Sequence, residues 1–197
     1  MWSQLLSLLF PPRHGSRSWE EITKGDLASL AHVHAVSRCP HTYALLPYAK
    51  PEVRELLWAL KYRGATSVGT TLGGLLAQFL PTLSLPPETV FVAMPLSKER
   101  LRQRGFNQCE VIASGAGLFC SPVLVRTRNT EHQARLSHAR RAKNIAGSFS
   151  IADHADIAGK SVVLIDDVVT TGATMQEARA TLLNAGAKEV ICIALAH

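Results

Sequence analysis

Two adjacent carboxylates, Asp166 and Asp167, follow an apolar run in the segment SVVLIDDVVTTGATMQEA. The run Ser161–Ile165 is typical of a buried strand, and neighbouring residues at its end point to opposite faces. Carboxylates accept hydrogen bonds well from two vicinal hydroxyl groups, such as those of a ribose. We therefore expect one carboxylate to meet a ligand directly and the other to orient it or to hold a water molecule of Mg²⁺.

The residues after the carboxylates are suited to binding an anion. Hydroxyl groups of Thr170, Thr171 and Thr174 surround a tight turn at Gly172, and a helix is expected over Ala173–Ala185. Backbone N–H groups at the start of such a helix favour a phosphate. The alternative, a capped helix preceded by two incidental turn acids, explains this pattern poorly. The sequence contains neither a Walker loop nor a GxGxxG fingerprint.

Basic side chains are concentrated in two stretches. They are Lys98, Arg100, Arg102 and Arg104 in the first, and Arg126, Arg128, Arg135, Arg140, Arg141 and Lys143 in the second. Together with the net charge of +6, they indicate an anionic partner, although a solvated basic face is the alternative. The stretches contain almost no aromatic residues, which argues mildly for a small polyphosphate over single-stranded nucleic acid.

Strands and helices are expected to alternate along most of the chain. The expected strands are Thr42–Leu46, Glu88–Met94, Val123–Arg126, Gly147–Ile151, Ser161–Ile165 and Glu189–Ala196. The expected helices are Trp19–Val36, Pro51–Tyr62, Thr70–Leu80, Phe106–Leu118 and Ala173–Ala185, with an arginine-rich loop before Phe106. The pattern predicts an α/β fold with a mostly parallel central sheet flanked by helices, whose ligands bind at the carboxyl edge. We expect this domain to span residues 46–197 and residues 1–45 to form a small appendage.

The remaining composition indicates a protein of the reducing cytoplasm. Four cysteines, Cys39, Cys109, Cys120 and Cys192, show no disulfide or CxxC spacing. The N-terminal apolar run is expected to form a short amphipathic helix that stops at two prolines, rather than a signal sequence. No stretch has the roughly 20 apolar residues that would span a membrane. The sequence leaves the oligomeric state open, and a homodimer is one alternative.

The segment LIDDVVTTGAT resembles the phosphoribosyl-pyrophosphate motif of type I phosphoribosyltransferases. Further pieces resemble the ComF branch of that group. They are LLSLLFPPR near the start, LKYRG (Leu60–Gly64), AMPLSKERLRQRGFNQ (Ala93–Gln108) and RTRNTEHQARLSHARRAKNIAGSF (Arg126–Phe149). The resemblance implies the type I phosphoribosyltransferase fold and binding of phosphoribosyl pyrophosphate together with Mg²⁺.

The resemblance also implies roles for individual residues. The ribose 5-phosphate would be bound by Asp166, Asp167, Val169, Thr170, Thr171, Gly172, Ala173 and Thr174. Pyrophosphate would be bound by Pro95, Leu96, Ser97, Lys98, Arg104 and Gly105. A mobile loop would contain Arg126, Arg128, Gln133, Arg140, Arg141 and Asn144. Within these sets, the catalytic residues would be Asp166, Asp167, Arg104 and Arg141.

One departure from the family concerns metal binding. ComF-like proteins usually carry an N-terminal cysteine cluster of the zinc-ribbon kind, but here no cysteine precedes Cys39. His32, His34, Cys39 and His41 lie close together in sequence without a recognised zinc spacing, so scattered surface histidines are the preferred interpretation. Zinc is therefore not expected, and Mg²⁺ is the expected cofactor, bound through the ligand near the two aspartates.

Two functions fit these observations. The first is an enzyme that transfers a phosphoribosyl group to an unknown acceptor and releases pyrophosphate. The second, which the ComF resemblance suggests, is a module for DNA uptake or recombination that binds single-stranded DNA or recombination proteins. The acceptor would be selected by a hood built mostly from residues 1–50. Lys61 and Arg63 fit equally well as helix-end cations and as substrate contacts.

Overall fold

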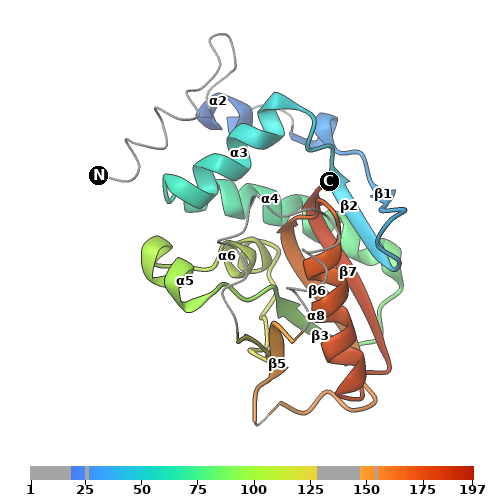
Figure 1. The fold of residues 1–197 in the computed structure, drawn as a ribbon. Coiled ribbons are helices and arrows are strands. Elements are labelled where there is room, and N and C mark those ends of the chain that lie inside the picture. The colour runs from blue at the N-terminus through green and yellow to red at the C-terminus, as the bar shows by residue number, and fades with distance from the viewer. Residues whose placement is uncertain (1–18, 25–26, 128–146, 154) are drawn as a thin grey trace.

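The centre of the fold is a pair of long parallel strands rich in small and branched apolar residues. The computed structural model describes residues 19–24, 27–127, 147–153 and 155–197. In it, β6 (Ser161–Val168) pairs with β7 (Glu189–Ala196), and helix α8 (Ala173–Asn184) connects them (Figure 1). This is the βαβ unit that the sequence predicts.

Three further strands complete the main sheet, in the order β1-β2-β7-β6-β3. β2 (Thr42–Leu46) and β3 (Val90–Ala93) run parallel to the central pair, and β1 (His34–Ala35) is antiparallel at the edge. The mostly parallel sheet flanked by helices confirms the predicted type I phosphoribosyltransferase-like fold. The predicted domain boundary, between residues 45 and 46, falls inside β2.

Alternate residues of the central strands supply two separate cores. Val163 and Ile165 of β6 pack with α3 (Pro51–Tyr62), α4 (Thr66–Phe79) and α6 (Gln108–Gly115) on one face. On the other face, alternating β6 and β7 residues pack against α8 (Figure 1). Burying both faces explains why these strands are almost continuously apolar.

The smaller elements lie around this framework. They are α2 (Trp19–Lys24), the 3₁₀ turns η1 (Leu27–Leu30) and η2 (Leu80–Leu83), α5 (Lys98–Arg104), and the antiparallel pair β4 (Leu124–Arg126) and β5 (Phe149–Ile151). Among the described helices, none is both long and apolar enough to cross a membrane. The expected N-terminal amphipathic helix lies outside the described residues.

Three sequence predictions need correction. The helix expected over Trp19–Val36 ends at Lys24, and a 3₁₀ turn and β1 follow it. The arginine-rich loop is in fact α5, which ends where Gly105 adopts the left-handed conformation (φ 79°). The strand expected to stop at Ile165 continues to Val168, because its backbone keeps pairing with β7. Both aspartates therefore lie within the strand.

Glycines allow α4 and α6 to approach each other closely. A Cβ atom at Gly73 would lie 2.4 Å from the carbonyl carbon of Gly115, whereas one at Gly74 would meet nothing within 4 Å. We expect Gly73→Ala to lower the free energy of unfolding by about 1–3 kcal/mol, because the helices must separate. Gly74→Ala is the matched control and should be stabilising by roughly 0.5–1 kcal/mol. Urea unfolding checks both, and equal effects would contradict this account of the helix contact.

Candidate functional site

A cavity of about 310 Å³ opens at the carboxyl edge of the sheet, beyond the ends of β3 and β6. It is lined by Tyr48, Lys61, Met94, Pro95, Leu96, Arg100, Gln108, Arg126 and the continuous segment from Asp166 to Met175. Carboxylates, hydroxyl groups and cations thus converge on a single hollow. The location agrees with the rule that ligands of open α/β sheets bind at this edge.

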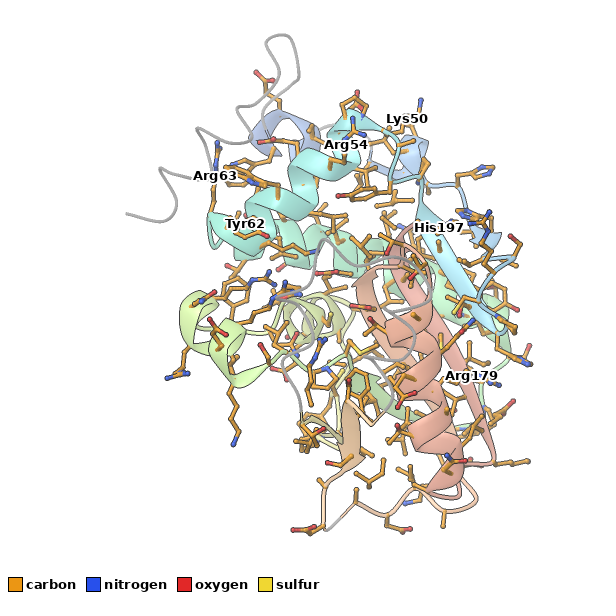
Figure 2. The ribbon with its side chains drawn as sticks, in the orientation of Figure 1. Lys50, Arg54, Tyr62, Arg63, Arg179 and His197 are labelled. Atoms are coloured by element: carbon orange, nitrogen blue, oxygen red, sulfur yellow. The ribbon has the colours of Figure 1, made fainter. Side chains whose placement is uncertain are left out.

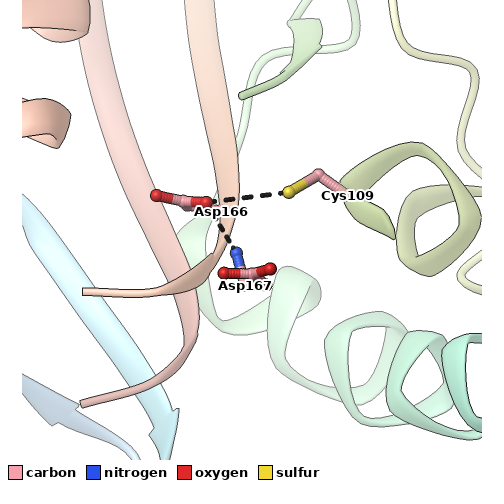
Figure 3. A group of neighbouring side chains, drawn as sticks. All are labelled: Cys109, Asp166 and Asp167. Carbon is pink, nitrogen blue, oxygen red and sulfur yellow. Dashed lines mark hydrogen bonds between the residues drawn. The ribbon is translucent and has the colours of Figure 1, made fainter. Parts of the chain in front are cut away.

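Asp166 and Asp167 make different contacts although they are adjacent (Figure 3). Asp166 Oδ1 accepts a hydrogen bond from the backbone N–H of Asp167 (2.8 Å) and lies 3.7 Å from the thiol of Cys109, which donates to it. Asp167 is buried, with 5% of its surface exposed, whereas Asp166 is only partly buried. The two adjacent carboxylates therefore have different surroundings.

A chain of polar contacts holds Asp167 in place. Asp167 Oδ2 forms an ion pair with Lys61 Nζ (2.9 Å) and accepts a hydrogen bond from Gln108 Nε2 (2.7 Å). Gln108 Oε1 in turn accepts from Arg104 Nη1 (2.8 Å), and the Arg104 guanidinium lies over the ring of Tyr62, 5.4 Å from its centroid. Tyr62 extends from the end of α3 (Figure 2). The network therefore connects α3, α5 and α6 to β6.

The electrostatics of the acid pair follow from burial and proximity. Loss of solvent, then the neighbouring Asp167 charge, raise the pKa of Asp166 to about 7 from its ordinary value of 3.8. Burial, followed by the two carboxylates, raises the pKa of the Cys109 thiol well above its ordinary value. The thiol therefore keeps its proton and is available as a hydrogen-bond donor to Asp166.

The phosphate-binding segment predicted from sequence forms a turn that enters α8. Gly172 adopts the left-handed conformation (φ 79°) immediately before the helix. A Cβ at this position would lie 2.9 Å from Cys39 Cβ and 3.0 Å from its sulfur. Gln176 Nε2 also donates to the backbone carbonyl of Arg38 (2.9 Å). The turn before β2 thus packs directly against the loop, and only glycine fits where they meet.

The residues predicted to bind pyrophosphate divide into two groups. Pro95 and Leu96 line the cavity. Ser97 instead caps α5, where its hydroxyl oxygen accepts from the backbone N–H of Arg100 (3.3 Å). Lys98, Arg104 and Gly105 do not line the cavity. Arg104 reaches the acid pair indirectly, through Gln108, and Gly105 ends α5.

Most of the predicted mobile loop lies outside the described residues. This applies to Arg128, Gln133, Arg140, Arg141 and Asn144. Arg126, on β4, lines the cavity, and its guanidinium lies 5.5 Å from the centroid of the Phe149 ring. The ends of the segment meet where the Thr127 hydroxyl donates to the Gly147 carbonyl (3.0 Å), and Gly147 N–H donates to Glu177 of α8 (2.6 Å).

Several lining residues were not among the site residues predicted from sequence. They are Tyr48, Met94, Arg100, Gln108, Val168 and Met175. Lys61, for which the sequence left substrate contact open as one of two alternatives, also lines the cavity. Predicting a helix over Lys98–Arg104 would have indicated Arg100 as a site residue. Arg100 is four residues from the predicted site residue Arg104 and therefore lies on the same helix face. No local pattern points to Tyr48, which comes from the loop after β2.

At the acid pair, only the carboxylate oxygen atoms are suitable ligands for Mg²⁺. Single ligand atoms from Cys109, Asp166 and Asp167 lie within 4.8 Å of one another. However, a protonated thiol is a poor partner for a hard ion, and Asp167 Oδ2 already contacts Lys61 and Gln108. Asp166 Oδ1 accepts from the Asp167 N–H and the Cys109 thiol, and Asp166 is a partly exposed residue of the cavity lining. The set fits an ion held by one carboxylate, water and ligand phosphates, which is the usual coordination of Mg²⁺.

Comparison with known proteins agrees with this geometry. The family described as "Phosphoribosyl transferase domain" matches residues 116–197, which contain Asp166, Asp167 and the loop before α8. The DNA utilization protein YhgH of Escherichia coli strain K12 is 32% identical over 151 residues, covering 71% of this chain and 65% of that protein. The competence protein ComFC of Bacillus subtilis strain 168 is 31% identical over 137 residues, covering 68% and 55%. The chain thus spans less than two thirds of the length of these relatives.

One solved structure matches most of the chain at low identity. The adenine phosphoribosyltransferase of Leishmania tarentolae is 17% identical, with a TM-score of 0.45, over 82% of this chain and 79% of that one. The sequence relatives named above confirm the predicted resemblance to the ComF group. Residues 116–197 thus match the phosphoribosyl transferase domain family, and the chain is similar to the DNA utilization protein YhgH and the competence protein ComFC.

Proposed function

We propose that the chain binds phosphoribosyl pyrophosphate with Mg²⁺ at the segment from Val162 to Thr174 and transfers the phosphoribosyl group to an acceptor. The observation that carries the proposal is the convergence, on one cavity, of an acid pair, a phosphate-type loop and two arginines. Carboxylates are acceptors for ribose hydroxyls, and the loop before α8 presents N–H groups to a phosphate. These are the two ends of a ribose 5-phosphate.

The proposed division of work follows the contacts. Asp166, partly exposed, accepts from a ribose hydroxyl and helps hold Mg²⁺, which neutralises pyrophosphate charge when it is bound. Asp167 is a positioning residue, fixed by Lys61 and Gln108. Arg100 and Arg126 line the same cavity, where their charges would stabilise the departing pyrophosphate. Burial lowers the pKa of both guanidinium groups, because their charges have lost contact with water. A bound anion beside them would offset this loss of solvation.

Calorimetric titration of phosphoribosyl pyrophosphate with Mg²⁺ tests this proposal. We expect saturable binding to the wild type and none to the Asp166→Asn/Asp167→Asn double variant, because Asp166 loses the charge with which it accepts from a ribose hydroxyl and Asp167 loses its ion pair with Lys61. Asp153→Asn, an acidic position that does not line the cavity, serves as the control and should bind like the wild type. Absence of binding to the wild type, or unchanged binding to the double variant, would reject the site.

A second candidate function rests on the relatives. The names of two of them refer to DNA utilization and competence, and the net charge of +6 is compatible with DNA. The proposed alternative is a weakly catalytic or non-catalytic module that binds single-stranded DNA. Fluorescence anisotropy with a labelled single strand should then show affinity that falls steeply with salt concentration. Negligible binding at low salt would reject this candidate and leave the small-ligand proposal untouched.

A further inference from the structure

Three histidines from distant parts of the sequence meet at the edge of the sheet. His34 lies on β1, and His32 precedes it. His197, labelled in Figure 2, follows β7 at the carboxyl edge. The ring centroids of His32 and His34 are 5.6 Å apart, and those of His34 and His197 are 5.5 Å apart. The cluster lies outside the cavity, whose lining contains none of the three.

We propose that His34 and His197 bind one divalent transition-metal ion of the Zn²⁺ class, through His34 Nε2 and His197 Nδ1. These two nitrogens lie 3.3 Å apart. Zinc–imidazole bonds of about 2.0–2.1 Å in a tetrahedral arrangement place two ligand nitrogens about 3.3–3.4 Å apart. The two nitrogens now face each other as a hydrogen-bonded pair, in which His197 Nδ1 donates to His34 Nε2. Metal binding would replace this shared proton with the ion, so that His197 takes the tautomer with its proton on Nε2.

The tautomer of His34 is already the one that metal binding requires. His34 Nδ1 lies 2.9 Å from the backbone carbonyl oxygen of His32. Because a carbonyl oxygen can only accept, this contact places the proton of neutral His34 on Nδ1 and leaves a lone pair on Nε2. A backbone carbonyl that accepts from the remote ring nitrogen is the usual support of a metal-binding histidine.

The backbone of the cluster is held on β2 at all three positions. His34 pairs with Ala44, the N–H of His32 donates to the Leu45 carbonyl (2.8 Å), and the N–H of His197 donates to the Leu46 carbonyl (3.1 Å). Strand positions hold ligands more precisely than loops do. Imidazole suits Zn²⁺, Cu²⁺ and Ni²⁺ rather than Mg²⁺, so this ion is distinct from the one expected at the acid pair. Two protein ligands leave further coordination positions open to water.

The test is equilibrium binding of Zn²⁺ alone to the tag-free protein. We expect the wild type to bind one more Zn²⁺ ion than His34→Ala or His197→Ala, or to bind it at least tenfold more tightly. His41→Asn is the matched control, because this nearby histidine has a left-handed backbone (φ 57°) that asparagine tolerates, and its Zn²⁺ binding should equal that of the wild type. If the circular dichroism spectrum shows that His34→Ala is unfolded, His34→Gln replaces it as the test variant.

A spectroscopic readout separates this site from other zinc ligands. X-ray absorption at the zinc edge should show two imidazoles at about 2.0 Å in the wild type and lose this signal in His197→Ala. His34→Ala should bind phosphoribosyl pyrophosphate like the wild type. Failure of the metal-site proposal can therefore be distinguished from failure of the ribose-phosphate proposal. No Zn²⁺ binding by the wild type, or identical binding by the wild type and both histidine variants, would overturn the assignment.

Discussion

Replacing Asp166 by asparagine is expected to stabilise the folded protein above neutral pH while it abolishes binding of phosphoribosyl pyrophosphate. In the folded protein the pKa of Asp166 is raised to about 7 from 3.8. Between these values the folded state retains a proton that the unfolded chain has lost, so the free energy of unfolding falls as the pH rises and the loss is complete above pH 7. Asparagine keeps an oxygen that accepts from the Asp167 N–H and carries no charge to bury.

Urea unfolding at pH 5 and pH 8 measures this effect. Each pH unit between 5 and 7 contributes about 1.4 kcal/mol, so the advantage of Asp166→Asn over the wild type should grow by about 3 kcal/mol from pH 5 to pH 8. Asp156→Asn is the control, because this side chain is 78% exposed and should change stability by less than about 0.5 kcal/mol at either pH. An advantage that does not change with pH would contradict the raised pKa.

The second large effect is expected at Gly172, where the loop before α8 packs against the turn before β2. Gly172→Ala places a Cβ at a left-handed position, which costs roughly 1–2 kcal/mol. The same Cβ would collide with Cys39 at 2.9 Å, and overpacking of this kind adds about 1–3 kcal/mol. We therefore expect a total loss of roughly 2–5 kcal/mol in the free energy of unfolding. Phosphoribosyl pyrophosphate binding should be lost as well, because the loop must move away from its present position.

Gly117→Ala separates the two contributions. Gly117 has a similar φ of 74°, but a Cβ there meets nothing within 4 Å. Its substitution should therefore cost only the backbone contribution, about 1–2 kcal/mol, and should leave ligand binding intact. Unfolding curves and calorimetric titrations of both variants provide the comparison. Equal losses of stability for Gly172→Ala and Gly117→Ala would show that contact with Cys39 does not constrain the loop.

The parts of the fold with strong periodicity could be predicted from sequence. The bounds expected for Pro51–Tyr62 and Glu189–Ala196 agree with the structure, because one has a clear apolar helical face and the other is buried on both sides. α5 was missed because its seven residues are mostly charged and none is buried. Its flanking signals, Ser97 at the start and Gly105 at the end, were present in the sequence.

The residues alone predicted the part of the site that is continuous in sequence, and the family resemblance added the lining residues Pro95, Leu96 and Arg126. The acid pair and the loop after it form one continuous segment, and the structure brings all of it to the cavity. The ion pair between Lys61 and Asp167 could not be predicted, because it depends on how α3 lies against β6. The contact between Cys39 and Gly172 and the approach of His34 to His197 depend in the same way on the three-dimensional fold.

The strand order has a consequence for how the chain folds. β2 lies early in the sequence, yet in the described sheet its parallel partner is β7, with Thr42 beside Cys192. Pairing of such distant residues requires closure of a long loop before any contact is gained, which slows folding. During synthesis, β2 therefore has to wait for β7 to emerge from the ribosome. Ile193 and Leu195 of β7 belong to the same core cluster as the apolar face of α3, and they are absent over the same interval. The nascent chain therefore exposes part of this core, and is open to aggregation or chaperone capture, until β7 is made.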